Sequence, residues 1–72
     1  MTNTSELERR IRESGLHKSW ILNQLGIKSY ATLRAKIKND SEFTASEIDK
    51  LCDILNISKS QRGAIFFANN AE

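Results

Sequence analysis

The chain has 72 residues, of which 28% are charged and 39% hydrophobic, and its net charge is +2. A chain of this length has room for one small domain, and no stretch approaches the roughly 20 apolar residues that span a bilayer. One cysteine and one histidine exclude an internal disulfide and are too few for a structural zinc site. Because the polar start of the chain is unlike a signal peptide, we expect a single cytoplasmic domain over residues 1–72 that uses no metal or other cofactor.

The basic residues are concentrated in the first half of the chain. Residues 1–40 contain eight Lys or Arg and four Asp or Glu, whereas residues 41–72 contain three and five. Between Leu16 and Asn39 no residue is acidic and five are basic. This asymmetry is typical of a surface that binds a polyanion, and a solvated positive face is the alternative interpretation.

Capping residues and glycines predict two helices in the first third of the chain. Ser5 and Glu8 have the spacing of a capping box, so the first helix is expected to begin directly after Ser5. Gly15 is typical of the left-handed residue that ends a helix. A second, short helix is expected over residues 17–25, and Gly26 closes it.

A third helix is expected from Tyr30 to about Lys38. Ser29 precedes it and can accept a hydrogen bond from one of its free amides. Leu33 and Ile37 are four residues apart and therefore form its inward pair.

Two more capping boxes mark the last two helices. Thr44 and Glu47 begin the fourth helix, which Asn56 is expected to end because asparagine tolerates the left-handed conformation. Ser58 and Gln61 begin the fifth helix, which is followed by a polar tail over residues 69–72. No alternating strand pattern competes, so the sequence predicts an all-α fold of five short helices.

The segment over residues 17–38 consists of two short helices joined across a glycine, which is the layout of a helix-turn-helix. Residues 16–37 (LHKSWILNQLGIKSYATLRAKI) resemble helices two and three of the Cro and lambda-type phage repressor family. The resemblance continues over residues 43–58 (FTASEIDKLCDILNIS), including the family's common ending of an Ile-Leu pair, a polar residue, an aliphatic residue and serine. It implies a lambda-repressor-like DNA-binding domain.

On a helical wheel of the third helix, small residues lie on the outward face, where their methyl groups can approach thymine methyls. Arg34 on the flank is long enough to reach a guanine edge or a phosphate, and Tyr30 either donates to DNA or packs over the turn beside Leu33. The predicted base contacts are Tyr30, Ala31, Thr32, Arg34 and Ala35. The family often places a phosphate-binding side chain where Lys18 lies, and the predicted phosphate contacts are Lys18, Lys28, Lys36 and Lys38.

The resemblance implies a phage transcriptional regulator of the Cro kind, acting in a bacterial host cell. Two copies on a palindromic operator are the ordinary arrangement, so a homodimer is a possible partner state. Nothing in the sequence assembles into a catalytic constellation, and we do not expect an enzyme.

An antirepressor that binds the DNA-binding domain of a partner phage repressor is the alternative function. Lys28 makes the turn one residue longer than is usual in the family, and Leu22 occupies a position that is usually alanine. Large apolar side chains also exceed what one core-facing stripe needs. The predicted protein-partner surface is Trp20, Ile65, Phe66 and Phe67, although a rim position for Trp20 and wrapping of the C-terminal residues around the core are equally compatible with the pattern.

Overall fold

The computed structural model describes residues 1–68, which form five helices and no strand. The predicted polar tail over residues 69–72 lies outside the described residues. The helices are α1 (Thr4–Ser14), α2 (Lys18–Leu25), α3 (Tyr30–Ile37), α4 (Ala45–Leu55) and α5 (Lys59–Phe66). The predicted all-α fold with five short helices is therefore confirmed.

Local signals set most of the helix ends. Gly15 and Gly26 follow α1 and α2 with φ of 71° and 72°, and Asn56 ends α4 with φ of 56°. These left-handed residues stop each helix because continued right-handed helix needs negative φ. At the start of α4, the Thr44 hydroxyl accepts from the Glu47 amide and the Glu47 carboxylate accepts from the Thr44 amide, as the capping box predicts.

The predicted start of α1 is wrong by two residues. Asn3 is the N-cap residue, and its side-chain oxygen accepts a hydrogen bond from the Glu6 amide at 3.3 Å. The helix therefore begins at Thr4, and Ser5 lies inside it. Asn3, two residues before Ser5, supplies the same kind of acceptor as the serine, and tertiary contacts of the first residues favour it as the cap.

These tertiary contacts hold residues 1–3 between the ends of α3 and α5. The Thr2 amide donates to the Asn39 side-chain oxygen at 2.8 Å, and the Asn39 amide group donates to the Thr2 carbonyl at 2.9 Å. The Asn3 amide donates to the Ile65 carbonyl at 2.6 Å. Thr2 is consequently buried although it is polar.

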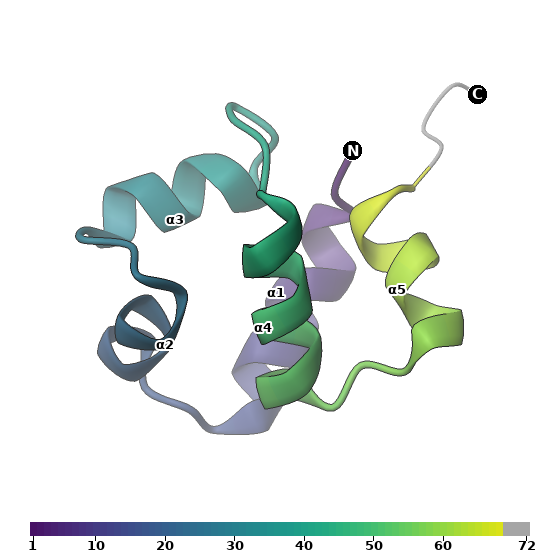
Figure 1. Cartoon of the computed structure of the whole chain (residues 1–72), viewed down its shortest axis with the longest axis horizontal. Coiled ribbons are helices and arrows are strands. Elements are labelled where there is room, and N and C mark those ends of the chain that lie inside the picture. The colour runs from purple at the N-terminus through teal and green to yellow at the C-terminus, as the bar shows by residue number, and fades with distance from the viewer. Residues whose placement is uncertain (69–72) are drawn as a thin grey trace.

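One apolar core joins all five helices. Figure 1 shows α1 and α4 in the middle of the molecule, with α2 and α3 on one side and α5 on the other. The buried apolar side chains are Leu7, Ile11, Ile21, Ile27, Leu33, Ile37, Ile48, Leu51, Leu55, Ile57, Ile65 and Phe66. Among residues 1–68, no helix combines the length and apolar character that crossing a membrane requires.

Candidate nucleic-acid interface

The segment between α2 and α3 fixes how α3 is presented. After Gly26, the Ile27 amide donates to the Leu22 carbonyl at 3.0 Å, and the Ile27 side chain enters the core. Lys28 and Ser29 complete the connection, and the Ser29 hydroxyl accepts from the Thr32 amide at 3.3 Å to cap α3. The turn is thus anchored by a buried isoleucine and a cap, and the additional residue Lys28 lies exposed on it.

The buried side of α3 holds the helix against the core and leaves a face of small side chains outside. Leu33 and Ile37 are buried, as predicted, and the Ile37 carbonyl accepts a hydrogen bond from the Thr4 hydroxyl at 2.6 Å. Ala31, Thr32 and Arg34 are exposed, and Ala35 is half-buried. We call these four residues the outer face of α3.

The first residues of α2 and α3 lie beside each other. The Lys18 ammonium lies 4.8 Å from the centre of the Tyr30 ring, which is a cation–π distance. Both residues stand at helix N-termini, where free amides carry partial positive charge. The two helix starts and Lys18 therefore form one electropositive corner, which includes the Tyr30 ring.

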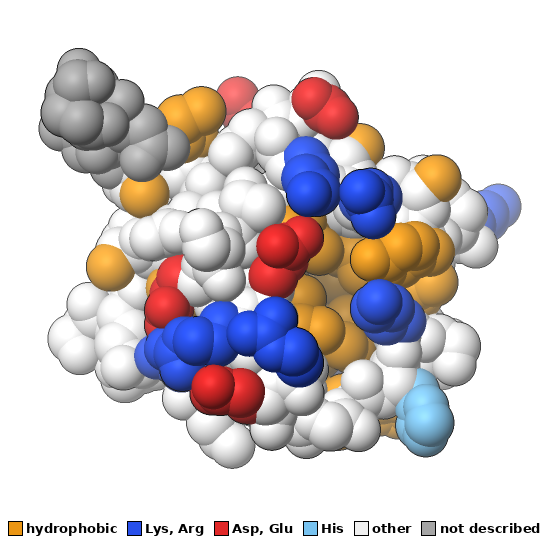
Figure 2. Space-filling model, turned by 180° about the vertical axis from the view of Figure 1, so that it is seen from behind, with side chains coloured by type: hydrophobic (Ala, Val, Ile, Leu, Met, Phe, Trp, Pro, Cys, Tyr) orange, Lys and Arg blue, Asp and Glu red, His pale blue; other side chains and the backbone are white. Residues whose placement is uncertain are grey.

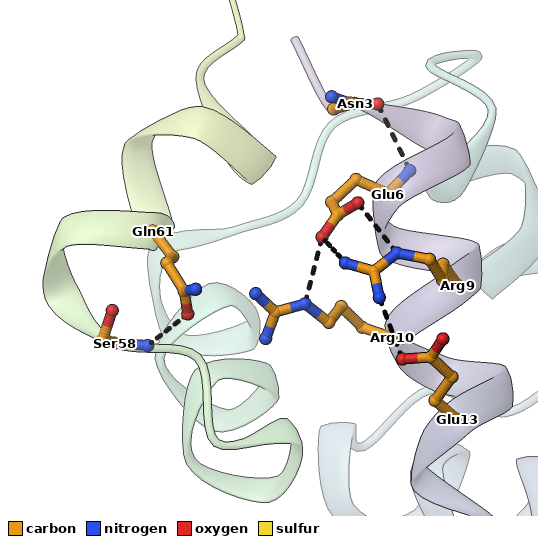
Figure 3. Close-up of polar contacts among 7 residues, drawn as sticks. All are labelled: Asn3, Glu6, Arg9, Arg10, Glu13, Ser58 and Gln61. Atoms are coloured by element: carbon orange, nitrogen blue, oxygen red, sulfur yellow. Dashed lines mark hydrogen bonds and ion pairs between the residues drawn. The ribbon is translucent and has the colours of Figure 1, made fainter.

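Arg9 and Arg10 on α1 form ion pairs with glutamates of the same helix. Figure 3 shows Glu6 accepting from both Arg9 and Arg10, and Arg9 also donates to Glu13 at 2.9 Å. Hydrogen bonds from Arg9 and then Arg10 lower the pKa of the Glu6 carboxyl, and those from Glu6 and then Glu13 raise the pKa of Arg9. These two arginines are therefore poorly placed to attract an external anion.

The structure corrects the expectation for Lys36 and modifies that for Lys38. The Lys36 ammonium donates to both carboxylate oxygens of Glu47, at 2.8 and 3.1 Å, and each side chain is only 13% exposed. Burial by itself would raise the Glu47 pKa, but hydrogen bonds from Lys36 and the Thr44 amide outweigh it, so the pKa is lowered. Lys36 is thus a structural ion-pair partner and does not face a phosphate. Lys38 lies 3.7 Å from Glu8 but remains exposed.

Six Lys and Arg side chains have no ion pair within residues 1–68. They are Arg12, Lys18, Lys28, Arg34, Lys50 and Lys59. Three of these, Arg12, Lys18 and Arg34, line a hollow of about 440 Å³ between α1, α3 and the start of α2. In Figure 2 an exposed apolar hollow is bordered by Lys and Arg side chains.

We call this feature the α1–α3 hollow. Its lining residues are Glu8, Ile11, Arg12, Gly15, Leu16, Lys18, Tyr30, Leu33, Arg34 and Ile37. Sequence reasoning did not single out Arg12, because it lies on α1 among charges of both signs, which are typical of a solvated helix face. Only the packing of α1 against α3 places it beside Lys18 and Arg34.

The predicted protein-partner surface divides into buried and exposed residues. Ile65 and Phe66 are 2% and 3% exposed and belong to the core, so their assignment to a surface is wrong. The Phe66 ring packs edge-on against Phe43, with 5.7 Å between ring centres. Trp20 and Phe67 are 42% and 64% exposed. They belong to α2 and to the end of α5, which lie at opposite ends of the molecule in Figure 1, so they do not form one patch.

Comparisons of the chain with protein-family models, with curated proteins and with solved structures gave no match.

Proposed function

We propose that this chain is a small transcriptional regulator of the phage Cro kind that binds duplex operator DNA with α3 in the major groove. The observation that carries the proposal is the outer face of α3, a braced helix face of small side chains next to unpaired cations. Ala31 and Thr32 allow the helix backbone to come close to base edges, and Arg34 beside them can bind a guanine edge bidentately. Such a regulator acts in the cytoplasm of the bacterial host.

Phosphate contacts are assigned first to the two unpaired lysines next to α3 in the described chain. Lys18, at the N-terminus of α2, lies beside Tyr30 at the start of α3, and Lys28 lies on the turn directly before that helix. Phosphate oxygens there can also reach free helical amides. Lys38 contributes after release from Glu8, an exposed pair of little strength. Two copies on a palindromic site complete the arrangement.

The test is a fluorescence-anisotropy titration of the full chain with mixed-sequence duplex DNA at about 50 and 200 mM salt. Three or four phosphate contacts predict that affinity falls by roughly tenfold or more across this range, because each contact releases condensed counterions. Absence of binding at the lower salt concentration would overturn the proposal.

The second candidate function is an antirepressor that binds the DNA-binding domain of a phage repressor. The exposure of Trp20 and Phe67 favours it, because large exposed aromatic side chains are enriched at the centres of protein interfaces. Its test is capture of a phage repressor DNA-binding domain by wild type, Trp20→Ala and Phe67→Ser, with circular dichroism to show that helicity is kept. Unchanged capture by both variants would exclude this surface.

A further inference from the structure

We propose that the α1–α3 hollow binds an acidic amphipathic helix of a partner protein, and that this helix competes with DNA for the electropositive corner. The second half of the proposal depends on the proposed DNA-binding function, whereas the first half does not. Both rest on the chemistry of the hollow, whose floor is apolar and whose rim is cationic.

The floor of the hollow selects for apolar side chains. Ile11, Leu33 and Ile37 form it with parts of their side chains, and Leu16 and the Tyr30 ring extend it toward α2. Its volume of about 440 Å³ falls in the range of about 300–1,000 Å³ that is usual for binding pockets. An occupant with apolar side chains at helical spacing removes this surface from water, which a phosphate backbone does not.

The rim of the hollow selects for negative charge on the same occupant. Arg12, Lys18 and Arg34 lie around the opening and have no ion pair within residues 1–68. The single lining carboxylate, Glu8, lies 3.7 Å from the Lys38 ammonium. Three basic groups against one acidic group match Asp and Glu side chains beside the apolar stripe, and they disfavour a basic or neutral helix.

Competition follows from shared residues. Lys18, Tyr30 and Arg34 belong both to the hollow and to the proposed DNA contacts. An occupant that pairs with Lys18 and Arg34 removes two of the cations that α2 and α3 offer to DNA. A partner carrying such a helix would therefore act as a protein switch on operator binding.

The probe is a fluorescein-labelled helical peptide with leucines at i, i+3 and i+4 positions and glutamates on the flanking positions. Its control is a peptide of the same composition in scrambled order, which keeps the charge and loses the apolar stripe. We expect saturable binding of the patterned peptide and an affinity for the scrambled peptide that is roughly tenfold weaker. Equal affinities would overturn the proposal.

Arg12→Ala and Lys28→Ala are the matched variants, because each removes one unpaired cation and only Arg12 lines the hollow. Arg12→Ala is expected to weaken peptide binding roughly threefold to tenfold, and Lys28→Ala to leave it unchanged. With duplex DNA we expect the opposite result: Lys28→Ala weakens binding, and Arg12→Ala leaves it unchanged. If Arg12→Ala weakened DNA binding and left peptide affinity unchanged, the hollow would be part of the DNA-binding site and the proposal would fail.

Displacement of bound DNA by the peptide distinguishes the proposed DNA-binding function from the proposed peptide site in the hollow. With labelled DNA bound to the chain, the unlabelled patterned peptide is expected to lower the anisotropy and the scrambled peptide is not. If the chain binds no DNA at all, the proposed function and the competition fail together, while the direct peptide titration still tests the hollow. If peptide and DNA bind at the same time, competition is excluded.

Discussion

Lys36 and Glu47 join the last turn of α3 to the first turn of α4 through two hydrogen bonds, at 2.8 and 3.1 Å. Glu47 also accepts from the Thr44 amide at 2.9 Å, so one carboxylate both caps α4 and holds α3. We expect Lys36→Met to lower the free energy of unfolding by about 1–2 kcal/mol, because it leaves a largely buried carboxylate without its charged donor. Urea denaturation measures this change.

A double-mutant cycle with Glu47→Gln isolates the pair. Glutamine keeps a side-chain oxygen for the Thr44 amide and removes only the charge. We expect a coupling free energy of about 1 kcal/mol between Lys36→Met and Glu47→Gln. Strictly additive effects would show that the contact adds nothing to stability.

The lowered pKa of Glu47 predicts a loss of stability in acid. Its carboxyl has an ordinary pKa of 4.5, which applies to the unfolded chain, and a lower pKa in the folded chain. The unfolded state therefore takes up the proton first, so the stabilisation is complete above the ordinary value and is lost as the pH falls through the folded value. Unfolding free energies measured at about pH 6 and about pH 3 should fall more for wild type than for Glu47→Gln. Parallel pH profiles would contradict the assignment.

Asn39 combines a left-handed backbone, with φ of 72°, and a side chain that makes two hydrogen bonds to Thr2. Asn39→Gly keeps the backbone freedom and loses the hydrogen bonds, and we expect a loss of about 1–2 kcal/mol. Asn39→Ala adds the left-handed penalty, about 1 kcal/mol more. Asn56→Gly is the control, because Asn56 has φ of 56° but its side chain makes no hydrogen bond within residues 1–68. A loss at Asn56 as large as that at Asn39 would refute the role given to the Thr2 contact.

Adjacent phenylalanines are expected to behave differently. Phe66 is buried against Phe43, so Phe66→Ala should lower the free energy of unfolding by about 3–5 kcal/mol. Phe67 is exposed, and Phe67→Ser should change it by less than about 0.5 kcal/mol. Thermal or urea denaturation of the two variants provides the comparison, and equal losses would contradict the observed burial.

Variants of Arg34 and Arg9 test whether DNA binding depends on unpaired cations on α3 and not on net charge. Arg34→Ala is expected to weaken operator binding by about 1–3 kcal/mol, because its guanidinium is unpaired on the outer face of α3. Arg9→Ala makes the same change in net charge but removes a group already paired with Glu6 and Glu13. Anisotropy titrations at one salt concentration should show a loss for Arg34→Ala only. Equal losses would indicate binding through net charge alone.

The five helices could be predicted from the sequence because their signals are local. Ser29, Thr44, Gly15, Gly26 and Asn56 each act within one turn of the helix that they start or stop. The spacing of Leu33 and Ile37 likewise identified the buried side of α3. Capping and periodicity operate over four residues or fewer, so a single sequence contains the information needed to read them.

Only the tertiary structure decided which charged and apolar residues are available at the surface. Lys36 was expected to face outward like its basic neighbours, but α4 brings Glu47 to it from eleven residues away. The packing of α5 on the core decides that Ile65 and Phe66 are buried and Phe67 is exposed. The contact of α1 with α3 places Arg12 in the same hollow as Lys18 and Arg34. Ion pairing and burial depend on which helices pack against each other, and the order of residues along one helix does not determine that packing.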